Sequence, residues 1–311
     1  ESIEPSKYNS AKAYIPVERH LLGDSKPYLY KTTDFGKSWE FISKAKNGIP
    51  NDHFTRVLRE DPVREGLLYT GTEYGVFISF DDGGSWKKFQ QNLPITPITD
   101  LKIFRGDLIL STMGRGFWIL DNITSLRQND INNLNKKPHL FQPDNTIRYR
   151  FPNVRSSFPK YPRTSVIMDY FIPKGTKEGI QLDVYNSKNE LITTVVSDTT
   201  MFSSNVEEVE DMNLSQIFRY VNNKLTSKPG FHRFTWNLRR KGAWAKNIKR
   251  RFKNGPLVPP GTYTARLTMS DQMVEQSFEI IIDPRVLDEG ITKEDLKKQL
   301  QFQNKVIALL S

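Results

Sequence analysis

In this 311-residue chain, the pair of residues considered first for acid–base catalysis is Asp52 and Glu73. Glycoside hydrolysis needs two carboxyl groups about 5–9.5 Å apart, one of which is protonated. Both residues stand in short polar segments between apolar runs, where such a pair could face a substrate. They are therefore the candidate catalytic pair, and the alternative is that both are ordinary solvated loop charges.

A second set, made of Arg115, Tyr74 and Glu73, contains ingredients of a sialidase site. Such a site combines an arginine cluster, which binds the substrate carboxylate, with a nucleophilic Tyr and Glu pair. Two of the three arginines have no identifiable counterpart, so the sequence argues against this enzyme. Gly114 and Gly116 would let Arg115 project freely, either to bind an anion or to bond carbonyl groups of a neighbouring sheet.

The four histidines, His20, His53, His139 and His232, show no metal-ligand spacing, and no glycine-rich phosphate loop opens a helix. We therefore expect no metal and no cofactor. Zero cysteines exclude disulfides, thiolate metal sites and cysteine nucleophiles. His232 is expected to pack in or beside a strand.

The composition, with 37% hydrophobic and 26% charged residues, is that of a globular chain with room for about two domains. No apolar run approaches the ~20 residues that a membrane-spanning helix needs. The net charge of +10 lies entirely in residues 131–311, with its densest part in Arg239–Lys253. That patch could attract an acidic glycan or lipid headgroups, or be a solvated loop. Nucleic acid is not expected, because no recognised nucleic-acid module accompanies it.

An internal repeat defines the elements that must position these residues. Thr32–Trp39 recurs 47 residues later as Ser79–Trp86, and both segments have the form [S/T]-x-D-x-G-x-S-W. The Asp carboxylate can accept backbone N–H groups within a tight turn, Gly tolerates positive φ, and Trp can pack between neighbouring sheets. The predicted structural residues are Asp34, Gly36, Trp39, Asp81, Gly83 and Trp86.

A third copy follows, in which Gly114–Ile119 matches Glu73–Ile78, but it ends at Leu120-Asp121-Asn122 without the Gly and Trp of the turn. We interpret residues 1–123 as the C-terminal blades of an Asp-box β-propeller, with this copy as the terminal one. A closed propeller needs ~4–8 blades, and this chain holds about three. The missing blades are expected from upstream sequence or from a separate chain.

The repeat places the candidate binding residues at one end of the blades. In a blade the Asp box joins the third and fourth strands, so function is expected at the opposite end. The residues there are Glu18, Arg19, His20, Asp24, Asp52, His53, Glu73, Tyr74 and Arg115. Arg19, His20, His53, Glu73, Tyr74 and Arg115 are the predicted binding residues.

The two boxes resemble the BNR repeats of sialidases, sortilin-type receptors and two-propeller xyloglucanases. The phrases Arg59-Glu60-Asp61-Pro62, Leu68–Glu73 and Gly116–Asp121 are similar to those of large bacterial proteins with a sortilin-type propeller, often labelled glycosyl hydrolases. In that family an Ig-like domain follows, with phrases such as Phe231–Arg239 and Pro259–Tyr263. The resemblance implies the C-terminal part of a longer, exported polypeptide.

The second half of the chain predicts an antiparallel β-sandwich followed by a helix. Strands are expected at 165–172, 180–185, 191–196, 231–238, 262–269 and 274–282. The fold class is therefore all-β: propeller blades at 1–123, an extended connection at 124–164, an Ig-like β-sandwich at 165–285 and a C-terminal helical segment at 286–311. A helical insertion is expected near 199–229. Thr292 should cap a helix with Leu296, Leu300, Ile307 and Leu310 on one side.

These patterns favour a fragment of an exported bacterial propeller protein that binds a glycan or a protein and acts as a scaffold in a cell-surface assembly. The expected partners are the upstream blades, together with an acidic glycan or a cell-surface protein complex. The alternative is a glycoside hydrolase of the BNR-repeat type whose catalytic carboxylates lie mostly in upstream blades.

Overall fold

The computed structural model describes residues 2–128, 137–150, 164–175, 179–197, 225–240, 242–243, 255–269 and 272–310. The chain divides into two compact units, Glu1–Asp130 and Ile131–Ser311, and each is described here by itself. Strands dominate both units, so the predicted all-β class is confirmed. Within the described ranges, none of the helices has the length and apolarity to cross a membrane.

The first unit holds three antiparallel sheets in which the strands follow one another in chain order. The first sheet consists of β1 (Glu4–Pro5), β2 (Ala13–Val17), β3 (Tyr28–Thr32) and β4 (Glu40–Phe41). The second consists of β5 (Thr55–Glu60), β6 (Leu68–Thr72), β7 (Gly75–Ser79) and β8 (Lys87–Lys88). The third has three strands, β9 (Ile98–Phe104), β10 (Asp107–Thr112) and β11 (Phe117–Leu120).

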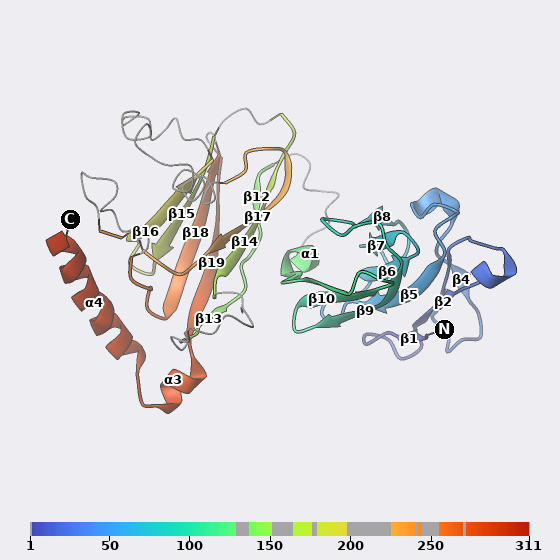
Figure 1. Ribbon diagram of the computed structural model, residues 1–311, viewed down its shortest axis with the longest axis horizontal. Helices are drawn as coiled ribbons and strands as arrows, with labels where there is room; N and C mark the ends of the chain where they lie inside the picture. The colour runs from blue at the N-terminus through green and yellow to red at the C-terminus, as the bar shows by residue number, and fades with distance from the viewer. Residues whose placement is uncertain are drawn as a thin grey trace. The chain divides into compact units, whose positions relative to one another are not determined.

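The second sheet lies between the other two (Figure 1), and both of its faces are buried. Every residue of β6 and β7 is buried. One core joins Tyr14 and Leu29 of the first sheet to Phe77 of the second. Another joins Tyr69 of the second sheet to Leu110 of the third. Burial of a middle sheet on both faces explains why β6 and β7 are buried at every position rather than at alternate ones.

The two repeated turns, Thr32–Trp39 and Ser79–Trp86, are named the box turns here. In each, the Asp carboxylate accepts the N–H and the hydroxyl of the Ser four residues later: 2.9 and 2.6 Å for Asp34 and Ser38, 2.8 and 2.6 Å for Asp81 and Ser85. A β-carbon on Gly83 would lie 2.7 Å from Ile42, and its φ is +87°. Both carboxylates therefore accept hydrogen bonds from their own turn, which is a structural role.

The two box tryptophans have different surroundings. Trp86 is 4% exposed, packs in the core between the first and second sheets, and donates its indole N–H to the carbonyl of Ile42 at 2.9 Å. Trp39 is 40% exposed and lies against Gly36. The expectation that both pack between sheets is therefore wrong for Trp39, because no described sheet lies on its side of the first sheet.

The third sheet ends differently from the other two. After β11 the backbone turns at Asn122, and the short helix α1 (Thr124–Gln128) follows. Ile123 is buried beside the core of the second and third sheets, and Arg127 binds both oxygens of the buried Asp61 at 3.0 Å. A helix anchored by an ion pair thus closes this end of the core, where a box turn stands in the other sheets.

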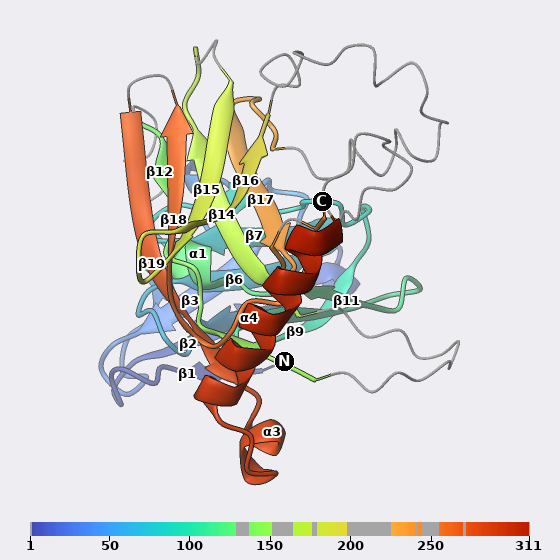
Figure 2. The same cartoon turned by 90° about the vertical axis from the view of Figure 1, so that its left-hand side faces the viewer.

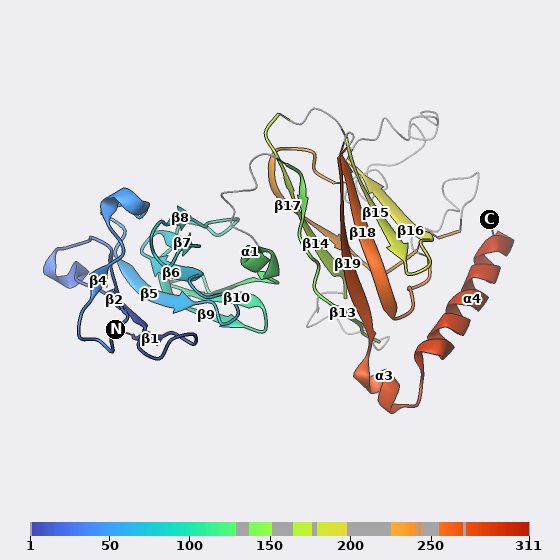
Figure 3. The same cartoon turned by 180° about the vertical axis from the view of Figure 1, so that it is seen from behind.

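The second unit is a sandwich of two sheets that share one core (Figures 2 and 3). One sheet has the order β12 (His139–Leu140), β14 (Val166–Ile172), β17 (Gly230–Trp236). The other has the order β13 (Thr146–Arg148), β19 (Gln272–Ile282), β18 (Gly261–Met269), β15 (Ile180–Asn186), β16 (Leu191–Val196). The predicted strands agree with these bounds to within two residues.

The expected extended connection at 124–164 contributes structure to both units. It supplies α1, then β12, and then β13, which pairs in parallel with β19. Phe141 is 1% exposed, whereas Phe151 and Tyr161 lie outside the described residues. The sequence did not reveal β12 and β13 within this connection, because strands of two or three residues have too short a pattern to detect.

Two helices follow the sandwich, α3 (Pro284–Asp288) and α4 (Lys293–Leu310). Thr292 caps α4 as predicted, since its hydroxyl accepts the N–H of Asp295 and its own N–H binds the Asp295 carboxylate. Leu296 is buried, but Leu310 is mostly exposed, unlike the expected stripe. The helical insertion expected near 199–229 and most of the basic run 239–253 lie outside the described residues.

Candidate functional site

The predicted binding residues lie at the end of the three sheets opposite the box turns, named here the loop end. The β6–β7 hairpin carries Glu73 and Tyr74, and the β2–β3 loop carries Glu18, Arg19 and His20. Thr55, at the start of β5, pairs with Thr72, so Asp52 and His53 enter at the same end. The β10–β11 hairpin brings Arg115 there too.

Arg56 of β5 organises the centre of the loop end. Its guanidinium donates to Glu18 and to Glu73, each at 2.9 Å. It also lies over the ring of Phe54, 4.8 Å from the centroid. The arginine side chain is 18% exposed and the two carboxylates slightly more, so the three charges are partly shielded from water. One planar guanidinium therefore ties the β2–β3 loop to the β6–β7 hairpin.

His20 extends this cluster. Its ring stacks on Phe54 with centroids 4.5 Å apart, and its Nδ1 lies 2.9 Å from the Glu18 carboxylate. Phe54 is thus covered by His20 and by Arg56. These contacts hold the β2–β3 loop against the start of β5.

The second group of contacts orients Tyr74. The carboxylate of Asp52 binds His53 Nδ1 at 2.8 Å, and the His53 ring lies 4.7 Å from that of Tyr74. The hydrogen bond with His53 holds the pKa of Asp52 below its usual value. Tyr74 is 40% exposed and Asp52 is more open still. The Tyr74 ring is therefore packed against His53, which is itself bonded to Asp52, and remains partly open to solvent.

Arg19 and Arg115 lie outside these two groups. Arg19 contacts the Tyr28 ring and lies 3.7 Å from Asp24, whose pKa is lowered by the hydrogen bond from Tyr28. Arg115 is exposed, between two glycines with φ of +80° and +71°. The structure thus brings Glu73, His20 and Glu18 together through Arg56, and His53 with Tyr74, while Arg115 stands apart.

Arg56 was missed from the sequence, and so was its neighbour Arg59 on the same strand. Arg59 lies 2.9 Å from Asp100 of β9 and 3.7 Å from Glu4 of β1. One side chain on β5 therefore joins the first strands of all three sheets. A charged residue inside a strand whose neighbours are apolar was the available signal. Its partners, however, are distant in sequence and could not be assigned.

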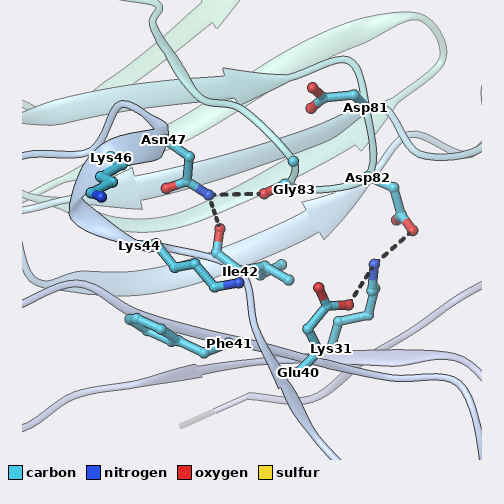
Figure 4. Close-up of a pocket in the computed structure, with 11 residues that line it drawn as sticks. Lys31, Glu40, Phe41, Ile42, Lys44, Lys46, Asn47, Asp81, Asp82 and Gly83 are labelled. Carbon is cyan, nitrogen blue, oxygen red and sulfur yellow. Dashed lines mark hydrogen bonds and ion pairs between the residues drawn. The ribbon is translucent and has the colours of Figure 1, made fainter.

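A cavity of about 220 Å³ opens on the box-turn side, between the first and second sheets (Figure 4). Its carboxylates and the amide nitrogen of Asn47 are already bonded within the protein. Asp81 is bound in its turn, Asp82 accepts from Tyr14 and from Lys12 and Lys31, and the Asn47 amide donates to Ile42 and Gly83. We therefore assign this cavity a packing role and place the candidate site at the loop end.

Both candidate catalytic carboxylates at the loop end already have partners within the chain. Glu73 is engaged by Arg56, and Asp52 by His53. A glycosidase acid must hold a proton, which the lowered pKa of Asp52 opposes. Among the described residues, no group of three or more His, Asp or Glu side chains could hold a metal ion.

The chain matches no protein-family model and no curated protein. Among solved structures it aligns at 10% identity with three proteins. With PorZ, a bacterial surface component of the type-IX secretion system of Porphyromonas gingivalis, the TM-score is 0.28 over 87% of this chain and 37% of PorZ. With a GH74 xyloglucanase from Xanthomonas campestris it is 0.28 over 63% and 28%.

The third alignment is with the extracellular domain of a putative hybrid two component system from B. thetaiotaomicron, with a TM-score of 0.25 over 82% of this chain and 29% of that one. The chain spans little more than a third of the length of PorZ and less of the other two. Superpositions at this level do not establish a shared fold, so function is argued from the chain's own residues.

Proposed function

We propose that residues 2–128 are neighbouring blades of an Asp-box β-propeller, that the second unit is an Ig-like sandwich, and that the loop end binds a glycan within an exported bacterial scaffold protein. Three meander sheets that stack face to face, with box turns all at one end, support the propeller assignment. The hydroxyl of Tyr263, bonded to the carbonyl of Pro259 four residues earlier, supports the Ig-like assignment.

The observation that carries the ligand class is the open ring of Tyr74 between fixed polar groups. A sugar presents a C–H face that packs on an aromatic ring and a rim of hydroxyls that need donors and acceptors. Asp52 supplies acceptors, and His53 holds the ring in place. Because these groups are ordered before a ligand arrives, binding loses little conformational freedom.

The scaffolding part of the proposal rests on the ion pairs of β5. Arg56 and Arg59 each bridge two carboxylates from different elements, which stiffens both ends of the strand. A stiff surface whose carboxylates are held by arginine and histidine side chains is suited to holding a partner rather than transforming it. Hydrolysis therefore ranks below binding.

The test is a polysaccharide microarray that carries neutral glucans, xylans and mannans and acidic alginate and heparin, probed with the purified chain. We expect binding that Tyr74→Ala lowers at least tenfold. Tyr8→Ala is the matched control, since Tyr8 is 39% exposed and lies between β1 and β2 at the box-turn end. Its binding should equal that of the unaltered protein.

Two results would overturn the proposal. Absence of any bound polysaccharide would remove the glycan and leave a protein partner as the ligand. Release of reducing ends from a bound polysaccharide, abolished by Glu73→Ala or Asp52→Ala, would make the chain a glycoside hydrolase.

A further inference from the structure

The three sheets of the first unit differ at their outer edges. In the first sheet the N–H of Ile42, next to β4, donates to the carbonyl of Leu29 at 2.9 Å. In the second sheet the N–H of Phe89, next to β8, donates to the carbonyl of Val76 at 2.8 Å. In the third sheet, Phe117 holds the position of the acceptors Leu29 and Val76. It belongs to β11, which is the last strand of that sheet. Within the described part of the chain, no strand pairs with its outer side.

The alternation of hydrogen-bonded residue pairs between β10 and β11 shows which backbone N–H and C=O groups of β11 face outward. Thr112 donates to the carbonyl of Gly116 at 3.2 Å, so bonded pairs with β10 fall at every second residue from there. Phe117 and Ile119 lie between those pairs, and their N–H and C=O groups point to the open edge. Their side chains are 79% and 59% exposed. An apolar edge with four unpaired backbone groups is a template for another strand.

The sequence of this edge is complementary to itself. If a second β11 pairs antiparallel to the first, centred on Trp118, Phe117 of one copy stands opposite Ile119 of the other. These are the two residues with outward backbone groups, so each pair makes two N–H to C=O bonds. An aromatic ring beside a β-branched side chain is a favourable cross-strand pair.

The charges at the ends of β11 favour the same arrangement. Arg115 precedes the strand and Asp121 follows it, each three residues from Trp118. Antiparallel pairing about Trp118 therefore brings Arg115 of each copy next to Asp121 of the other. A parallel strand would instead set like charges side by side.

We propose that β11 is a self-association edge through which two copies of this chain form a symmetric dimer with a continuous six-stranded sheet. The interface is isologous, as two-fold dimers require. Because the paired segment is only four residues long, the dimer is a reversible one that depends on concentration. Of the predicted binding residues at the loop end, this interface uses Arg115 and does not use Tyr74, His53 or Glu73.

The test is analytical ultracentrifugation of the purified chain over a range of concentrations. We expect a monomer–dimer equilibrium. Arg115→Asp replaces two attractive contacts by two repulsive ones and should raise the dissociation constant on the order of tenfold, as should Asp121→Arg. The double variant Arg115→Asp/Asp121→Arg restores opposite charges and should recover the dimer. Lys188→Asp, an equal charge reversal in an exposed turn of the second unit, should leave it unchanged.

Rescue by the double variant separates pairing at this edge from a general loss of folding, since a misfolded single variant would not be repaired by a second reversal. A chain that stays monomeric at every concentration would overturn the proposal. So would a dimer whose dissociation constant is the same in both single variants as in the unaltered protein.

Discussion

Replacement of the two box tryptophans should destabilise the first unit unequally. Trp86 and Trp39 hold the same position in the repeat, yet they are 4% and 40% exposed. Only Trp86 has an indole N–H bond that crosses to another sheet, to the carbonyl of Ile42. The pair therefore compares one residue type in one local motif, with and without a neighbouring sheet.

The difference in exposure corresponds to roughly 90 Å² of a side chain that buries at most about 250 Å². At about 25 cal/mol per Å², burial alone makes Trp86→Ala about 2 kcal/mol more costly than Trp39→Ala. The lost hydrogen bond adds about 1 kcal/mol. We therefore expect the free energies of unfolding of the two variants to differ by about 3 kcal/mol, before any further cost of the cavity left by Trp86.

The assay is hydrogen exchange by mass spectrometry at increasing urea, read on peptides that cover β5–β8, because this separates the first unit from the sandwich. Trp86→Ala should shift the unfolding midpoint of those peptides to lower urea much more than Trp39→Ala. Equal shifts, or a larger one for Trp39→Ala, would refute the stacking of the first two sheets around Trp86.

Three further predictions follow from ion pairs and hydrogen bonds. The hydrogen bonds from Ser38 lower the pKa of Asp34 to about 2. The stability that ionised Asp34 contributes is therefore complete above the ordinary carboxyl pKa and is lost as pH falls from about 4 through about 2. Asp34→Asn should flatten that part of the acid-unfolding curve. Arg127→Ala leaves the buried Asp61 without its cation and should cost about 3 kcal/mol in urea unfolding, part of which Asp61→Asn recovers. Arg56→Met should raise hydrogen exchange in residues 18–24 and 72–75, whereas the control Arg59→Met, which touches neither segment, should not.

The box turns could be predicted in detail because every bond in them is local. Thr32 and Asp34 bond groups within four residues, and so do Ser79 and Asp81. The long sandwich strands were also accessible, since their alternation persists over seven or more residues. β1, β4, β8 and β12 have two residues each, which is below the length at which periodicity carries information.

The candidate site was predicted in position but not in connectivity. The order of the strands in the repeat places Glu18, Asp52 and Glu73 at one end of the sheets, and the structure has them there. The partner of Glu18 and of Glu73 depended on contacts across 38 and 17 residues of sequence, through Arg56. Trp39 was misjudged for a related reason, because a repeat fixes a residue's local turn and leaves open whether another sheet covers it.

In the first unit, structural contacts and candidate binding residues lie at opposite ends of the strands. The box turns use local hydrogen bonds to close the first and second sheets, and the middle sheet contributes to the two cores that hold the three sheets together. At the opposite end, Arg56 of β5 binds Glu18 and Glu73 and so sets the spacing of the β2–β3 loop and the β6–β7 hairpin. Glu73 and Tyr74 at the tip of the β6–β7 hairpin lie outside the two buried cores, so these positions can vary without loss of the fold, which is the property a binding surface requires.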